Sequence, residues 1–155
     1  MRKSFLSAAL AAFVTAAGFI SSAAAGNLNY PYGLTVDQNG ALYVANFYGG
    51  IARYDQNLIY QSTITANVSS PIAVGVGFGG AIYVANFGGN NVTVYNRSGT
   101  QINTISDASL YYPWSLTVDA DNNVWVLDLN GVVHPYLDTG TALPAYKTGG
   151  ASIGS

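Results

Sequence analysis

Hydrophobic and polar residues alternate along most of the chain in short runs. Apolar side chains recur at every second position in 34–36, 42–44 and 92–95. A period of two residues places β-branched and aromatic side chains on one face of a pleated strand, whereas a helix needs a period of about 3.6 residues. The pattern therefore predicts an all-β protein made of short strands.

Glycine, asparagine and aspartate separate these runs. The turn segments are 37–40 (DQNG), 77–80 (GFGG) and 119–122 (DADN). Tight hairpins favour these residues because Gly and Asn permit a positive φ and Asp accepts backbone hydrogen bonds. The acidic residues in these segments are therefore interpreted as turn caps rather than catalytic acids.

The whole pattern repeats about every 40 residues. Pro31, Pro71 and Pro113 lie 40 and 42 positions apart, and each is followed by three alternating runs and then by Tyr54, Tyr95 or Tyr136. A fourth run closes the first two units, at 59–64 and 101–105. Four strands in such a unit is the period of a propeller blade. The prediction is three four-stranded antiparallel β-propeller blades, at about 29–68, 69–110 and 111–148, forming an incomplete propeller arc or half of a six-blade ring.

The segments GLTVDQNGALYVANF and AVGVGFGGAIYVANFGGNNVTVYN resemble blades of the NHL and YVTN repeat families. The resemblance covers 29–143 and implies a β-propeller of a kind common in secreted proteins. Such propellers serve as binding platforms, as surface-layer components and, less often, as lyases or lactone hydrolases. The third unit departs from the pattern, with Leu127-Asp128 in place of Ala-Asn and Pro135 inside its third strand. Because proline lacks a backbone donor, that strand is predicted to be an edge strand or irregular.

Three blades leave two broad blade faces uncovered, since propellers close with about four to eight blades. Three explanations stand side by side: a homodimer that completes a six-blade ring, a fragment of a longer product, and a stable open arc. The segment 145–155 starts no convincing fourth blade.

The first 25 residues have the pattern of a cleaved secretory signal peptide. Arg2 and Lys3 precede an uncharged, alanine-rich apolar run at 5–20, and Ala23–Ala25 supply small residues before Gly26. The apolar run is shorter than the roughly 20 residues that span a bilayer. We expect a secreted or periplasmic protein at 26–155, with no membrane span after signal cleavage.

The amino-acid composition limits the kinds of site that the protein can contain. The 155 residues include no Cys, one His, five Lys and Arg and seven Asp and Glu, for a net charge of -2. These values exclude a disulfide scaffold and a Cys-ligated metal site, and they argue against a nucleic-acid partner. Asp119, Asp121 and Asn123 have part of the spacing of a calcium loop but lack its Gly and Glu. We therefore expect no metal, no cofactor and no catalytic residues. The single histidine, His134, stands beside Pro135, and no nucleophile-elbow sequence occurs in the chain.

The candidate ligand-binding residues follow the second strands and the repeated prolines. They are Tyr32, Asn46, Phe47, Asn86, Phe87, Trp114 and Asp128. Loops at one end of a propeller converge, so these side chains are predicted to form a small polar and aromatic lining. The alternative is that the Asn and Asp side chains bond their own turns while Tyr32 and Trp114 cover blade edges. Tyrosine is abundant, which suits carbohydrate stacking, although Tyr43 and Tyr83 occupy matched strand positions that point to packing between blades.

The sequence is therefore interpreted as a secreted β-propeller repeat protein that acts as a non-catalytic binding or interaction scaffold for a protein or carbohydrate ligand. The alternative is part of a propeller lyase or lactone hydrolase that a second chain or further blades complete.

Overall fold

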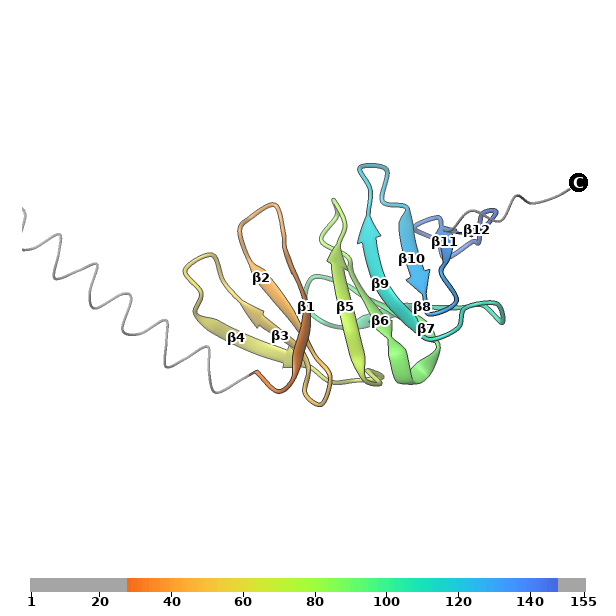
Figure 1. Ribbon diagram of the computed structural model, residues 1–155. Coiled ribbons are helices and arrows are strands. Elements are labelled where there is room, and N and C mark those ends of the chain that lie inside the picture. The colour runs from red at the N-terminus through yellow and green to blue at the C-terminus, as the bar shows by residue number, and fades with distance from the viewer. Residues whose placement is uncertain (1–27, 148–155) are drawn as a thin grey trace, which may run out of the picture.

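The computed structural model describes residues 28–147, which form three antiparallel sheets of four strands (Figure 1). The first sheet holds β1 (Pro31–Val36), β2 (Leu42–Asn46), β3 (Gly50–Tyr54) and β4 (Tyr60–Ile64); the second holds β5 (Pro71–Val76), β6 (Ile82–Asn86), β7 (Asn91–Tyr95) and β8 (Gln101–Ser106); the third holds β9 (Pro113–Val118), β10 (Val124–Asp128), β11 (Val132–Tyr136) and β12 (Tyr146–Lys147). A single 3-10 turn, η1 (Phe87–Gly89), follows β6. The predicted signal peptide at 1–25 lies outside the described residues.

The sheets stand side by side like blades around a hub. Each sheet is an up-and-down meander, with strands in chain order from β1, β5 or β9 outward. The three first strands are neighbours, β1 beside β5 and β5 beside β9 (Figure 1), while the fourth strand is the last in the order of each sheet. This arrangement confirms the prediction of four-stranded propeller blades. Among the described residues, no helix is long and apolar enough to cross a membrane.

The two largest groups of buried apolar side chains are layers between successive blades, and a smaller group, Val44, Ala52 and Tyr54, lies in the first blade. Tyr43 and Ile51 of the first blade pack on residues of the second such as Val84. Tyr83 and Val92 of the second blade pack in the same way on the third. The expectation that Tyr43 and Tyr83 serve packing between blades is confirmed, because both are almost fully buried there. Each buried Å² of apolar surface is worth about 25 cal/mol, so these layers hold the blades together.

Glycine allows the first strands to approach closely at the hub. A Cβ on Gly33 would lie 2.6 Å from the carbonyl oxygen of Ile72 on the neighbouring β5. A Cβ on Gly75 would lie 2.6 Å from the Leu116 Cδ1 atom on β9. Both glycines therefore set the spacing between blades.

Aspartate side chains cap the hairpin turns, as predicted. Asp37 Oδ1 accepts hydrogen bonds from the N–H groups of Asn39 and Ala41 at 2.8 and 2.9 Å. Asp119 accepts from the N–H groups of Asp121 and Asn123, and its Oδ2 accepts from the Asn123 amide and the Trp125 indole. Within residues 28–147, no group of three or more His, Cys, Asp and Glu side chains is placed to hold a metal ion.

The third blade is the irregular one. β11 lies between β10 and β12, so it is not an edge strand, but β12 pairs only with Val132 and Val133. Pro135 follows these residues and has no N–H to donate, and beyond it the sheet continues as one isolated bridge between Tyr136 and Ala142. The edge-strand alternative is therefore wrong, and the irregular alternative describes the blade.

Candidate functional site

The turns after the second strands gather at one end of the molecule, together with the segments that lead into the first strands (Figure 1). Eight aromatic residues meet there, which we call the aromatic band: Tyr30, Tyr32, Phe47, Tyr48, Phe87, Tyr111, Tyr112 and Trp114. The band crosses all three blades.

The four aromatic residues predicted from the repeats form the central line of the band. The ring of Tyr32 lies 5.6 Å from that of Phe47, centroid to centroid. Phe47 lies 6.3 Å from Phe87, and Phe87 lies 6.1 Å from Trp114. Tilted and edge-on pairs at these distances attract one another through the ring quadrupoles. The structure therefore joins Tyr32, Phe47, Phe87 and Trp114, which are up to 82 positions apart in sequence.

The other four rings extend the line at both ends. Tyr48 contacts Phe47 at 4.9 Å and Tyr30 at 5.1 Å. At the other end, Tyr112 contacts Phe87 at 4.8 Å and Tyr111 at 4.6 Å. Sequence reasoning did not select these four tyrosines. The available signal was that Tyr30 and Tyr112 directly precede two of the repeated prolines.

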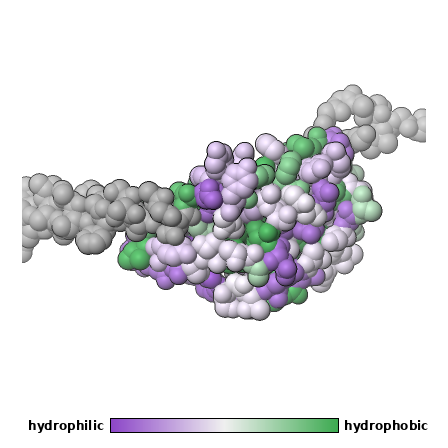
Figure 2. Space-filling view, turned by 90° about the horizontal axis from the view of Figure 1, so that it is seen from below, coloured by the Kyte–Doolittle hydropathy of each residue, from purple (hydrophilic) through white to green (hydrophobic). Residues whose placement is uncertain are grey.

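Much of the band is open to solvent. Tyr30, Tyr48 and Tyr32 are 65%, 66% and 57% exposed, and Trp114 is 46% exposed. Viewed from below in Figure 2, this end is mostly of intermediate hydropathy, with hydrophobic residues near its centre. Contiguous exposed aromatic surface of this kind is typical of interaction sites.

The backbone beneath the band adopts an unusual conformation. Tyr30, Ser70 and Tyr112, each directly before a repeated proline, have φ values of 54°, 48° and 48°. Residues with side chains rarely adopt this left-handed region, and a following proline normally favours extended backbone. Hydrogen bonds help to hold it, because the N–H of Phe47 donates to the Tyr30 carbonyl and that of Phe87 to the Ser70 carbonyl. The band thus rests on a fixed, strained support of the kind found at functional sites.

The three predicted polar residues lie below the surface. Asn46, Asn86 and Asp128 are buried at the ends of the second strands. Each side chain accepts a hydrogen bond from a backbone N–H located 17 positions earlier, in Asn29, Ser69 and Tyr111 respectively. These contacts fasten the segment that leads into each blade, so the three residues position the band from beneath.

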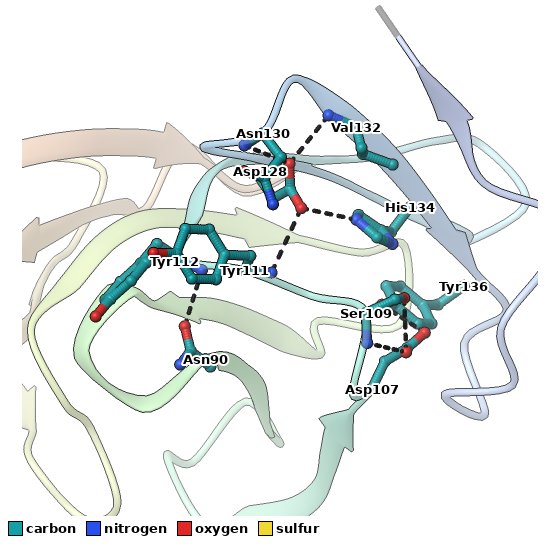
Figure 3. Close-up of polar contacts among 10 residues, drawn as sticks. All are labelled: Asn90, Asp107, Ser109, Tyr111, Tyr112, Asp128, Asn130, Val132, His134 and Tyr136. Atoms are coloured by element: carbon teal, nitrogen blue, oxygen red, sulfur yellow. Dashed lines mark hydrogen bonds and ion pairs between the residues drawn. The ribbon is translucent and has the colours of Figure 1, made fainter.

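Asp128 carries the most elaborate set of contacts (Figure 3). Its Oδ1 accepts from the N–H groups of Asn130 and Val132, and its Oδ2 lies 3.1 Å from His134 Nε2. Burial alone raises the pKa of the Asp128 carboxyl, but the hydrogen bonds from Val132, His134 and Tyr111 outweigh that effect and hold the pKa below its ordinary value. A carboxylate only accepts hydrogen bonds, so His134 Nε2 carries the proton.

The neighbouring Asp107 anchors Tyr136 (Figure 3). Asp107 accepts from the N–H and the hydroxyl of Ser109 at 2.8 and 2.7 Å, and from the Tyr136 hydroxyl at 3.3 Å. Burial and the adjacent carboxylate raise the pKa of the Tyr136 hydroxyl far above its ordinary value. Tyr136 is therefore a neutral, packed side chain. The ring of His134 stacks on it with the centroids 6.5 Å apart and is also buried in the interior of the blade.

A pocket of about 220 Å³ lies beside the band, between the first two blades. Phe47 and Tyr48 form one side of it, and Thr65, Val68 and Ser70 form the other. Pockets for drug-sized ligands measure about 300–1,000 Å³, so this one accommodates a single ring or a side chain of a larger ligand.

No protein-family model and no curated protein matches this sequence. Solved structures do match. The nidogen/laminin complex is similar with a TM-score of 0.69 and 17% identity over 78% of this chain and 48% of that chain. Virginiamycin B lyase from Staphylococcus aureus has a TM-score of 0.65 and 14% identity, over 77% of this chain and 42% of that chain. A gluconolactonase from Xanthomonas campestris has a TM-score of 0.62 and 17% identity, over 77% of this chain and 47% of that chain.

These structures are β-propellers, so the likeness shows that this chain has a propeller fold. The chain spans less than half the length of each of these three proteins. The neighbours include binding and enzymatic members, which is consistent with one fold serving several functions.

Proposed function

We propose that this chain is a secreted β-propeller repeat protein of the NHL/YVTN kind, and that it acts as a non-catalytic binding module through the aromatic band. The observation that carries the proposal is the continuity of the band: Phe47 and Phe87 link exposed rings from all three blades into one surface. Secretion is supported by the signal-like pattern at 1–25.

The chemistry of the band favours a neutral carbohydrate chain as ligand. Aromatic faces stack on the apolar faces of sugar rings, and tyrosine hydroxyls at the rim supply hydrogen bonds. All eight residues of the band are uncharged at neutral pH, and the row of rings is long enough for several contacts in succession. The pocket beside Tyr48 adds a place for one ring of the ligand.

The alternative is part of a propeller lyase or lactone hydrolase, and two of the similar structures are a lyase and a gluconolactonase. The side chains described here give that alternative little support. His134 is buried and bonded to Asp128, and both oxygens of Asp119 are engaged in its turn. A metal-dependent turnover of lactones or lyase substrates that chelation abolishes would reverse this ranking.

Affinity electrophoresis through gels that contain neutral polysaccharides, such as cellulose derivatives, xylan or mannan, tests the proposal. We expect at least one polysaccharide to retard the protein. Tyr48→Ala and Phe87→Ala should each weaken binding about tenfold, which corresponds to about 1.4 kcal/mol. Phe78→Ala is the matched control, because Phe78 is 64% exposed but lies in the β5–β6 turn, at the opposite end of the blade.

Retardation that is unchanged in the Tyr48 and Phe87 variants would show that the band is not the site. If no polysaccharide retards the protein but extended peptides bind the band, the ligand is a protein segment. Failure of both classes of ligand to bind would reject the binding proposal.

A further inference from the structure

Within residues 28–147, the first and third blades each present one sheet face on which no other blade packs. On the first blade, Leu34 and Val36 of β1 are 69% and 57% exposed, whereas Val74, the counterpart of Leu34 on β5, is 4% exposed. On the third blade, Thr117 is exposed, and Trp125 and Leu127 are only half-buried. We call these the first-blade face and the third-blade face.

The strand registers show that these two faces are complementary halves of an interface that already occurs twice. The first-blade face carries four residues with equivalents in the other blades: Leu34, Leu42, Val44 and Tyr54 correspond to Val74, Ile82, Val84 and Tyr95 and to Leu116, Val124, Val126 and Tyr136. Leu34 is exposed and Leu42 half-buried, whereas Val44 and Tyr54 are already buried within the single chain, at 6% and 2% exposed. Those two equivalent sets are the halves of the core layers that receive the preceding blade.

The third-blade face carries the opposite half. Trp125, Leu127 and Val133 are equivalent to Tyr43, Ala45 and Ile51 of the first blade and to Tyr83, Ala85 and Val92 of the second. The hydrogen bond that joins the aromatic ring of this face to a turn aspartate is also repeated. The Trp125 indole donates to Asp119 Oδ2 at 2.9 Å, as the Tyr43 hydroxyl does to Asp37 Oδ2 at 3.4 Å.

Each face has a shallow hollow where a neighbouring blade would insert side chains. The hollow on the third-blade face measures about 180 Å³ and is lined by residues such as Thr117, Trp125 and Val133. The hollow on the first-blade face measures about 70 Å³ and is lined only by Leu and Val side chains and Tyr54. No charged side chain lines either hollow.

We propose that the third-blade face of one chain packs on the first-blade face of a second copy, and that a two-fold axis along the hub closes two chains into a six-blade ring. Each copy contributes one face of each type, so two identical interfaces form and none is left open. Six blades lie within the usual range of about four to eight. This chain covers 48%, 42% and 47% of the three similar structures, so each of those proteins is about twice as long as the part that this chain matches. The proposal does not depend on the identity of the ligand.

The first test is the mass of the protein, expressed from its complete sequence, by sedimentation equilibrium. We expect twice the mass of the processed chain as measured by mass spectrometry. Leu34→Asp should give the monomer mass, because the exposed position accepts a charge in a single chain but not in the interface. Ile102→Asp is the matched control, since Ile102 is 60% exposed on β8 of the middle blade, away from both faces, and this variant should stay dimeric.

A second test locates the contact without relying on disruption. A Cβ at position 75 lies within 3.0 Å of the side chains of Leu116 and Val118. Position 117 is equivalent to 75, and Leu34 is equivalent to Leu116, so 117 of one copy should adjoin 34 of the other. Because the chain has no Cys, a mixture of the Thr117→Cys and Leu34→Cys variants should form a disulfide-linked dimer on mild oxidation, and neither variant should do so alone.

A monomeric wild-type protein would overturn the proposal, as would open-ended oligomers that grow with concentration. A dimer whose mass is unchanged by Leu34→Asp and that gives no mixed disulfide would show that another surface is used, and would equally reject the ring.

Discussion

The buried imidazole of His134 donates from Nε2 to Asp128 Oδ2 across 3.1 Å. The second blade has a hydrogen bond at the same place between different residues. At the equivalent positions there, the Asn86 amide donates to the Thr93 hydroxyl across 3.0 Å. In both blades the last residue of the second strand is bonded to the middle residue of the third. The polarity of the bond is reversed, because the carboxylate accepts where the amide donates.

This equivalence predicts how His134 can be replaced. A threonine hydroxyl at position 134 can still donate to Asp128, whereas valine has the same shape and no donor. We expect His134→Val to be less stable than His134→Thr by about 1–2 kcal/mol, since it leaves a buried carboxylate oxygen short of a partner. Urea unfolding of both variants measures the difference, and equal free energies of unfolding would contradict the prediction.

The aspartate contacts predict a loss of stability in acid. Hydrogen bonds from Ser109 lower the pKa of the Asp107 carboxyl, and those at Asp128 lower that pKa as well. The unfolded chain therefore takes up protons at a higher pH than the folded chain does. This contribution is complete above the unfolded pKa of about 3.9 and is lost as the pH falls through the lower folded values.

Urea unfolding between pH 7 and pH 2.5 measures this effect. Asp107→Asn should lose less stability over that interval than the wild-type protein, because one linked proton has been removed. Asp138→Asn changes the net charge equally at an exposed turn and serves as the control for the change in charge. Parallel curves for wild type and Asp107→Asn would count against the assigned contacts.

The close approach of the first strands predicts an order among three glycine substitutions. Gly33→Ala should be the most destabilising, because its Cβ meets the backbone carbonyl of Ile72, which cannot move independently of β5. Gly75→Ala meets the flexible end of Leu116 and should cost less, and both should fall within about 1–3 kcal/mol. Gly79→Ala meets nothing within 4 Å and should be neutral. Thermal unfolding of the three variants gives the order directly.

The two tryptophans provide separate optical probes. Trp114 belongs to the aromatic band, whereas Trp125 lies on the third-blade face and is bonded to Asp119. Saccharide binding to the band should change the emission of Trp114. The change should persist in Trp125→Phe and disappear in Trp114→Phe. A change in emission that disappears in Trp125→Phe and persists in Trp114→Phe would show that the saccharide binds the third-blade face and not the aromatic band.

The strands and turns were predictable because their causes are local. Alternating residues and an Asp at the start of a turn act within a few positions, as the hydrogen bonds that Asp37 accepts from the N–H groups of Asn39 and Ala41 show. The central line of the band was predictable for a related reason. Phe47 and Phe87 occupy equivalent positions in two repeats, and equivalent positions must lie side by side at one end of stacked blades.

The other residues of the band and the role of the buried polar side chains were not predictable, because they depend on contacts that do not recur in every repeat. Tyr48 aligns with Gly88 in the second unit, and Tyr111 aligns with Ser69, so neither position stands out. The role of Asn86 was open in the sequence because its backbone partner lies 17 positions away, in a segment that has no strand pattern. Only the folded geometry shows that this amide is buried beneath the band instead of exposed within it.

The fastening made by Asn46, Asn86 and Asp128 joins each second strand to backbone of the same repeat. Every repeat therefore contains both partners of the hydrogen bond that holds its entry segment. This fastening is internal to the repeat, whereas the apolar faces of the blade are buried only against adjoining blades. The contact above it can change its chemistry, because Asn86 with Thr93 in the second blade and Asp128 with His134 in the third both leave an oxygen that accepts from the backbone of the entry segment.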